Sequence, residues 1–227
     1  MFRSVWACAT LCALAAAAPA NAAEFLFENN NNAATINFDG FVGNSSGVIP
    51  GLSSTLTLRL LSGAGTKNLV FSYVLENTSI SAFDGSRVSG FSFDADPDVH
   101  RASIVLGDFS NINMRGMNYP NGIGDVEICL NDKNSCAGGG NGGATIGNPV
   151  AGEFTLSFLN APMDGVTLDR FYARYQSLPF GEGSASGQAV TTAVPEPGSW
   201  MLMLAGFFAL GFALRRRSTV VAKPQMA

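Results

Sequence analysis

The sequence predicts an all-β domain of the β-sandwich or jelly-roll type, and three observations lead to this prediction. Apolar and polar residues alternate over short stretches, most clearly from Thr55 to Leu60, so each stretch would bury one face and expose the other. Clusters of glycine, asparagine and aspartate separate these stretches and are typical of tight turns. No helical periodicity of useful length occurs between residues 23 and 193.

The expected strands follow one another along this part of the chain. Residues 35–38 and 55–60 alternate with period two, and residues 68–75 are rich in the β-branched and aromatic side chains that favour strands. The remaining expected strands are 88–93, 103–106, 126–130, 154–159 and 166–175. Turns are expected at residues 62–65, 84–85, 121–122 and 164–165. The aromatic residues of these strands, among them Phe71, Phe93 and Phe154, are expected in the core rather than on a sugar-binding face.

Residues 1–22 have the organisation of a secretory signal peptide. Arg3 supplies the positive charge, residues 5–18 form an apolar stretch, and Ala20 and Ala22 fit the small-residue rule for cleavage. The alternative is an uncleaved membrane anchor, which the short apolar stretch and the clear cleavage site disfavour. We therefore predict export through the Sec translocon and removal of residues 1–22 by signal peptidase.

The exported part, residues 23–193, carries 8 basic and 16 acidic residues, which gives a net charge of −8. Its length fits a single domain, which we place at residues 23–179. A surface of this charge repels phosphate groups, so no nucleic acid partner is expected. Residues 180–193 are rich in glycine and serine and are predicted to form a flexible linker.

Cys129 and Cys136 are the two cysteines that remain after removal of the signal peptide. Because export brings them into an oxidising compartment, we predict a disulfide between them. In the loop-closure model it would contribute about 2–3 kcal/mol. A metal site is the competing interpretation, but a lone cysteine pair without a nearby histidine is a poor ligand set.

Asp94, Asp96 and Asp98 are candidates for a calcium site, because carboxylates at alternate positions on a loop can converge on one ion. The pattern lacks the glycine and the distant glutamate of an EF-hand loop, and solvated turn carboxylates explain it more simply. The same aspartates are candidates for the acid and base of a hydrolase, although sequence spacing does not fix their separation. His100 is the only histidine, and no nucleophile elbow, which needs a strand-turn-helix context, is expected in this chain. We therefore predict no catalytic site, no metal and no cofactor.

The most distinctive stretch lies near the C-terminus. Pro195, Glu196 and Pro197 are followed by Trp200, by an uncharged apolar run over residues 200–214, and by Arg215, Arg216 and Arg217. The run is somewhat shorter than the roughly 20 residues of a standalone membrane span. Its arginine flank predicts a cytoplasmic tail at residues 218–227 by the positive-inside rule. We therefore predict one transmembrane helix over residues 200–214, with the domain in the periplasm.

Residues 194–217 resemble the PEP-CTERM sorting signal of Gram-negative bacteria in its Pro-Glu-Pro-x-x-Trp form. The resemblance implies that an exosortase, a membrane-embedded cysteine protease, recognises the tail and cleaves it near Pro195-Glu196-Pro197. The product would then be released or transferred to the cell surface. An ordinary C-terminal membrane anchor is the alternative interpretation. The residues after Arg217 depart from the pattern, since such proteins often end soon after the arginines.

The mature domain resembles the cistern family of PEP-CTERM proteins. The likeness rests on residues 38–41, 48–52, 87–91, 129–143 and 174–177. It implies no established activity, and the family context suggests an association with exopolysaccharide or biofilm.

Together these features lead to three hypotheses for the function. The first is a non-enzymatic cell-surface or extracellular-matrix protein, held transiently in the inner membrane and then located at the surface or outside the cell. The second is a carbohydrate- or calcium-binding sandwich module, and the third is a carboxylate-dependent hydrolase. The expected partners are the exosortase, the Sec translocon and signal peptidase, the membrane and exopolysaccharide.

Overall fold

The computed structural model describes residues 23–42, 47–133, 135–138, 141–179 and 183–190, which lie in one compact unit, Met1–Val190. This described part consists of strands, turns and one short 3₁₀ turn, η1 (Ser81–Phe83), with no α-helix. The all-β prediction is therefore confirmed. Within the same residues no helix is long and apolar enough to cross a membrane. The predicted signal peptide (1–22) and the predicted transmembrane helix (200–214) lie outside the described residues.

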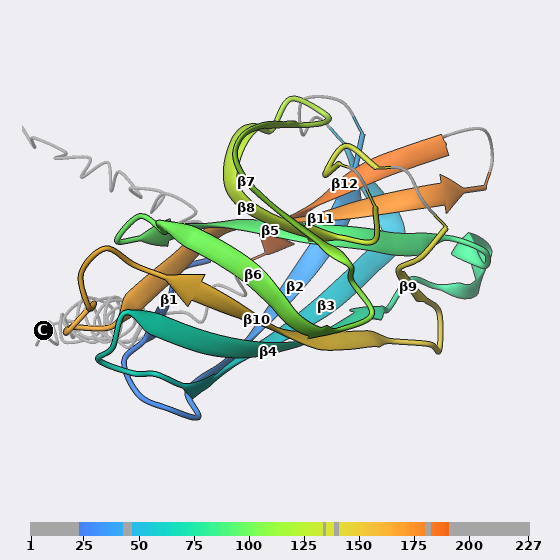
Figure 1. The fold of residues 1–227 in the computed structure, drawn as a ribbon. Coiled ribbons are helices and arrows are strands. Elements are labelled where there is room, and N and C mark those ends of the chain that lie inside the picture. Colours follow the sequence, from blue (N-terminus) through green and yellow to red (C-terminus); the bar gives the residue numbers. More distant parts are fainter. Residues whose placement is uncertain (1–22, 43–46, 134, 139–140, 180–182, 191–227) are drawn as a thin grey trace, which may run out of the picture. The chain divides into compact units, whose positions relative to one another are not determined.

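Twelve strands in the described part form one antiparallel sheet (Figure 1). The order across the sheet is β6-β10-β4-β3-β2-β12-β11-β5-β8-β7, with β1 paired to β11 and β9 paired to β5. The strands are β1 (Phe25–Phe27), β2 (Ala33–Phe41), β3 (Val48–Ser62), β4 (Asn68–Asn77), β5 (Arg87–Asp96), β6 (Arg101–Gly107), β7 (Asn111–Tyr119), β8 (Gly124–Asn131), β9 (Ala144–Thr145), β10 (Val150–Ser157), β11 (Val166–Leu178) and β12 (Gly183–Val190). Each strand expected from the sequence overlaps one of these, and β1, β7, β9 and β12 are additional.

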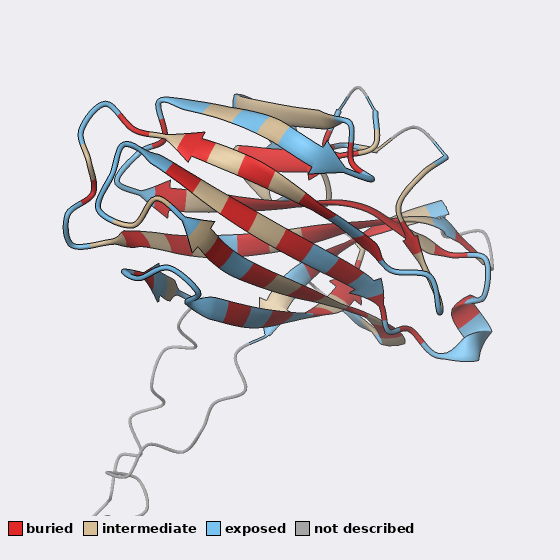
Figure 2. Ribbon diagram, turned by 60° about the horizontal axis from the view of Figure 1, so that its bottom comes forward, coloured by how far each residue is buried: buried red, intermediate tan, exposed pale blue. Residues whose placement is uncertain are grey.

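The alternation in the sequence appears as alternating burial along the strands (Figure 2). In β3, Leu56, Leu58 and Leu60 are buried, whereas Thr57 is partly exposed and Arg59 is exposed. This pattern follows from the pleat, which directs successive side chains to opposite faces of the sheet. One face of the sheet therefore supplies the core.

The core is aromatic and lies between two halves of the sheet. Tyr73 on β4 contacts Phe91 on β5 with ring centroids 5.4 Å apart, and Phe154 on β10 contacts Phe93 on β5 at 5.9 Å. The halves thus pack face to face, as the layers of a sandwich do. The difference from a two-sheet sandwich is that β12 is hydrogen-bonded to both β2 and β11, so the halves belong to one continuous sheet.

Strand β12 corrects the prediction of a flexible linker over residues 180–193, because residues 183–190 form an interior strand. Its small residues are required by its neighbours: a Cβ on Gly187 would lie 2.8 Å from the ring of Tyr175 and 3.1 Å from Cβ of Phe38. Ala185 is fully buried on the same strand. The glycine and serine content therefore reflects close packing, and the domain ends at Val190 rather than at residue 179.

The disulfide between Cys129 and Cys136 is confirmed, with the two Cα atoms 6.1 Å apart. Cys129 lies on β8 and Cys136 follows it, and both are buried in a small second cluster with Tyr119 and Val126. Met117 packs against this cluster, with its Sδ atom 3.5 Å from Sγ of Cys136. The disulfide therefore ties the loop after β8 back to that strand within the small cluster.

Candidate functional site

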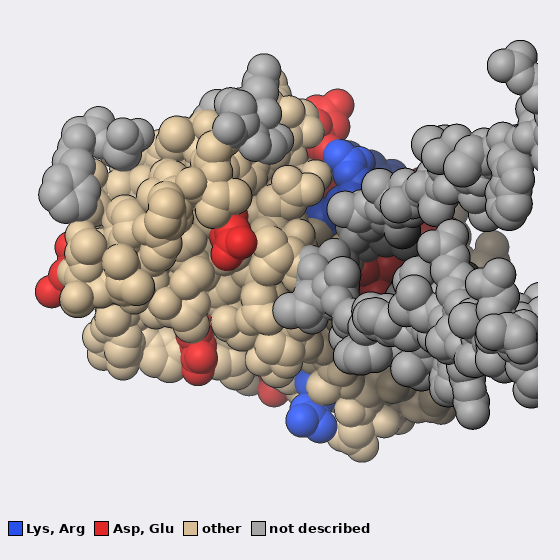
Figure 3. Space-filling view, turned by 180° about the vertical axis from the view of Figure 1, so that it is seen from behind, with Lys and Arg blue, Asp and Glu red and all other residues tan. Residues whose placement is uncertain are grey.

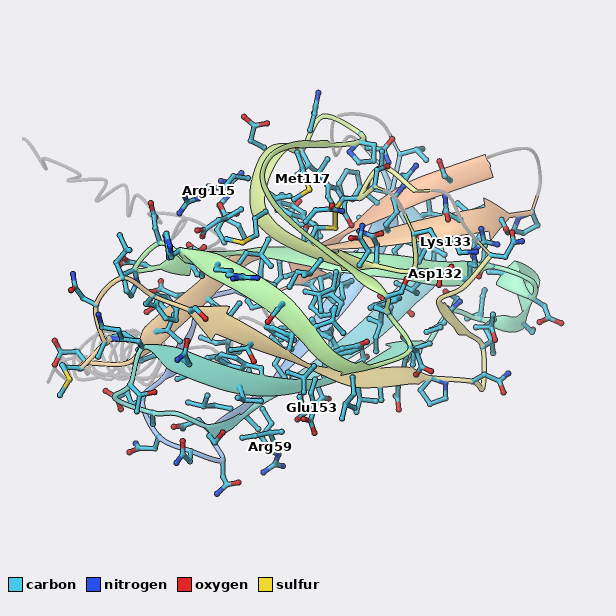
Figure 4. All side chains as sticks on the ribbon, in the orientation of Figure 1. Arg59, Arg115, Met117, Asp132, Lys133 and Glu153 are labelled. Carbon is cyan, nitrogen blue, oxygen red and sulfur yellow. A yellow bond between two sulfur atoms is a disulfide. The ribbon has the colours of Figure 1, made fainter. Side chains whose placement is uncertain are left out.

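The described part of the chain has an open acidic pocket where the β7–β8 ribbon separates from the rest of the sheet. Its volume is about 320 Å³. Carboxylates from three segments reach it, together with two guanidinium groups: Asp94, Asp96, Asp98, Glu127, Asp169, Arg115 and Arg170 line it with Ala95. Arg115 is on the β7–β8 ribbon, as Figure 4 shows.

The side chains of Asp94 and Glu127 connect β5 and β8 where the backbone pairing of these two strands ends. The two strands pair only from Gly90 to Phe93 on β5. Beyond this point the Glu127 N–H donates to Oδ1 of Asp94 at 2.8 Å. In return the Glu127 carboxylate accepts the N–H of Ala95 at 3.1 Å and of Val99 at 2.8 Å. This reciprocal arrangement, which we call the Asp94–Glu127 clasp, satisfies backbone donors that the separating strands would otherwise leave unpaired.

Arg170 and Arg115 lie close to the two carboxylates of the clasp and balance their negative charges. Arg170 forms an ion pair with Asp94 at 2.6 Å and also donates to the carbonyl oxygen of Asp125. Arg115 lies 3.6 Å from the Glu127 carboxylate and donates to the carbonyl oxygen of Val99. Asp94 and Glu127 thus already have fixed partners, which is typical of a structural rather than a catalytic role.

Burial raises the pKa of two carboxyl groups at this pocket, those of Asp169 and Glu127. Burial and the neighbouring Asp94, which is opposite on the adjacent strand, raise the pKa of Asp169. Burial also raises the pKa of Glu127, against the opposing effect of its backbone hydrogen bonds. The pocket is therefore a concentration of negative charge that is only partly compensated by the two arginines.

The structure places all three aspartates predicted as calcium candidates at this pocket, but in different environments. Asp94 is partly buried and bound in the clasp, whereas Asp96 and Asp98 are exposed. Among the described residues, no group of three or more acidic, histidine or cysteine side chains is arranged to hold a metal ion. His100, the residue considered for a triad, is exposed.

Sequence reasoning missed Glu127 and Asp169, which contribute to the pocket from β8 and β11. Glu127 had a detectable signal, since it is a charged residue inside the apolar stretch Val126 to Leu130. A partly buried carboxylate on such a strand requires a partner. The identity of that partner depends on strand pairing, which the sequence does not display.

Replacing Glu127 with glutamine is expected to change how stability depends on pH. Because burial raises the pKa of Glu127 above its ordinary 4.5, the folded domain retains a proton over a window in which the unfolded chain has lost it. The wild type should therefore lose stability relative to Glu127→Gln as the pH rises through that window. Urea unfolding followed by circular dichroism from about pH 4 to about pH 7 measures this difference. A difference that does not vary with pH would contradict the expectation.

Other charges are sparse on the face of the domain seen in Figure 3, where most of the visible surface is neither acidic nor basic. Arg174 is buried in the domain, where its guanidinium group donates to neutral oxygens: the carbonyl oxygens of Ala137 and Ala185 and the hydroxyl of Ser184. It ties the segment after Cys136 to β11 and β12, so its charge serves the fold.

The chain thus combines a disulfide-bonded all-β domain with a C-terminal segment that contains an apolar run followed by arginines. Exported proteins with C-terminal sorting segments have the same organisation. Residues 193–217 match the family model of the PEP-CTERM protein-sorting motif. This match covers Pro195, Glu196, Pro197, Trp200 and Arg215–Arg217, all of which lie outside the described residues. The motif implies an exported protein that is anchored in a membrane before an exosortase processes it. Searches of curated proteins and of solved structures gave no match.

Proposed function

We propose that this chain delivers a non-catalytic β domain to the cell surface or the extracellular matrix, in association with exopolysaccharide or biofilm. The observation that carries the proposal is the PEP-CTERM motif at residues 193–217, which follows directly after a folded domain ending at Val190. The resemblance of the domain to the cistern family supports the same role. In this proposal residues 200–214 hold the precursor in the inner membrane with the domain in the periplasm.

Processing by the exosortase separates the domain from its membrane segment. Hydrolysis near Pro195-Glu196-Pro197 adds one water across the broken peptide bond, so the domain gains a carboxylate and the tail gains an amino group. If an acceptor amine replaces water, the domain is instead joined to that acceptor through a new amide. Both routes leave β12 and the disulfide in the product, because both lie N-terminal to the motif.

Replacing Pro195, Glu196 and Pro197 together with alanine is expected to reduce the processed fraction at least about tenfold, because the protease then lacks its recognition sequence. The measurement is intact mass and C-terminal sequencing of the protein from surface and membrane fractions, with and without the exosortase. Pro224→Ala, a proline substitution outside the motif, is the matched control and should be processed like the wild type. Unchanged mass and location in the absence of the exosortase would refute the proposal.

The absence of catalysis is part of the proposal and rests on the clasp. Asp94 is engaged by Arg170 and by the Glu127 N–H, so it is poorly placed to act as a free base or nucleophile. The test is polysaccharide turnover by the wild type and by Asp94→Asn, Asp96→Asn and Asp98→Asn. Turnover by the wild type that any of these substitutions abolished would establish the hydrolase instead.

A further inference from the structure

Three sulfur atoms lie together in the small cluster at β7 and β8. Cys136 is joined to Cys129 by the disulfide, and Sδ of Met117 lies 3.5 Å from Sγ of Cys136. A cysteine pair alone is a poor ligand set for a metal ion. Met117 comes from the neighbouring strand, on the β7–β8 ribbon labelled in Figure 4, so sequence spacing did not reveal it as a third sulfur beside the pair.

Side-chain amide groups are directed at the two cysteine sulfurs. Nδ2 of Asn131 lies 3.5 Å from Sγ of Cys136 and 3.8 Å from Sγ of Cys129. Nδ2 of Asn113 lies 3.6 Å from Sγ of Cys136. Asn111 supports this orientation, because its own Nδ2 donates to Oδ1 of Asn113 at 3.3 Å and to Oδ1 of Asn131 at 3.5 Å. A disulfide sulfur is only a weak acceptor, whereas a thiolate carries a charge that such donors stabilise.

The three sulfurs are at the margin of the described domain. Strand β7 is the last in the order across the sheet, and the cluster of Cys129 and Cys136 is separate from the aromatic core. Both cysteines are buried, whereas Met117 is only partly buried and is the most accessible of the three. Reduction of the disulfide therefore leaves the packing between the two halves of the sheet in place.

We propose that the reduced domain binds one Cu(I) ion through Sγ of Cys129, Sγ of Cys136 and Sδ of Met117. Thiolate and thioether sulfurs are soft ligands of the kind that select Cu(I). With metal–sulfur bonds of about 2.3 Å, the value for a thiolate on zinc, three sulfurs in a plane around an ion lie about 4 Å apart. The separation of 3.5 Å between the sulfurs of Met117 and Cys136 is already close to this spacing.

Binding requires prior reduction of the disulfide by a dithiol. The dithiol supplies two electrons and two protons, so the bond between the two Sγ atoms breaks, two thiols form and the reductant becomes a disulfide. Cu(I) then displaces both thiol protons to solvent, which leaves one negative charge on the site. The N–H groups of Asn113 and Asn131 offset that charge and orient the ligands. The site does not depend on the sorting motif.

The test uses the exported protein purified from cells, reduced with dithiothreitol under argon and then freed of the reductant, with the oxidised protein in parallel. Cu(I) is added in competition with a coloured Cu(I) chelator, and bound metal is counted by elemental analysis. Circular dichroism shows whether each sample is folded. Met117→Leu removes the thioether at similar volume. Met114→Leu is the matched control on the same strand, because Met114 packs against the main core instead.

We expect about one Cu(I) per reduced chain and none on the oxidised protein. Met117→Leu should weaken Cu(I) binding at least about tenfold, whereas Met114→Leu should stay within about twofold of the wild type. Equal affinity of Met117→Leu and the wild type would overturn the proposal, because the third ligand would then not be Met117. Unfolding of the reduced wild type, or a folded reduced wild type that binds no Cu(I), would overturn it as well. Copper retained by the oxidised protein would place the ligands elsewhere and would have the same consequence.

Discussion

Phe154→Ala is expected to lower the free energy of unfolding by about 4 kcal/mol, the largest single effect that we predict for this domain. Phe154 on β10 is fully buried and stacks on Phe71 with ring centroids 5.5 Å apart. It also contacts Phe93 from the opposite half of the sheet at 5.9 Å. Truncation would leave a cavity at the place where the two halves meet, and rings held on separate strands can fill it only partly.

The measurement is urea unfolding of the domain followed by far-ultraviolet circular dichroism, since neither Trp6 nor Trp200 lies in it. Phe25→Ala is the matched control: Phe25 is only partly buried and has one close ring partner, Phe171 at 5.8 Å. Its expected cost is about 1 kcal/mol. Similar losses for both variants would mean that the two halves do not share a core at Phe154.

Gly187→Val is expected to destabilise the domain by about 3 kcal/mol through overpacking. The added side chain would begin 2.8 Å from the Tyr175 ring, and Tyr175 cannot move freely because its hydroxyl is hydrogen-bonded to Ser54 at 2.7 Å. Backbone pairing on both sides prevents β12 from shifting away. The same unfolding measurement applies.

Gly47→Val is the control for this substitution, because a Cβ at Gly47 would meet no atom within 4 Å. We expect a change below about 0.5 kcal/mol for this exposed site. If Gly187→Val were equally harmless, β12 would have to be loosely attached to its neighbouring strands.

Strands with large alternating side chains could be predicted from the sequence, and β3 is the clearest case, since Leu56, Leu58 and Leu60 all face the core. Strand β12 could not, because its core positions hold Ala185 and Gly187, which carry almost no hydrophobic signal. The absence of a side chain at Gly187 is dictated by Tyr175 and Phe38, which come from other strands. The local sequence indicates how much apolar surface a segment can bury. The space available to its side chains depends on residues from other strands.

The same limit applies to the acidic pocket. Asp94, Asp96 and Asp98 could be selected as a group because they are close in sequence, yet their environments are set by residues far along the chain. Arg170 reaches Asp94 from β11, and Glu127 reaches it from β8. Recognition of the tail, by contrast, was possible because its signal is contiguous, and the family match covers the same residues.

The position of β12 also has a consequence for the timing of export. A chain that crosses the membrane with its N-terminus first delivers β2 early and β12 last, although the two are adjacent in the finished sheet. Until residues 183–190 emerge, no backbone ladder connects the β2 side of the sheet with the β11 side. Pairing that spans most of the chain is slow to form. The sheet can therefore be completed only after residues 183–190 have crossed the membrane.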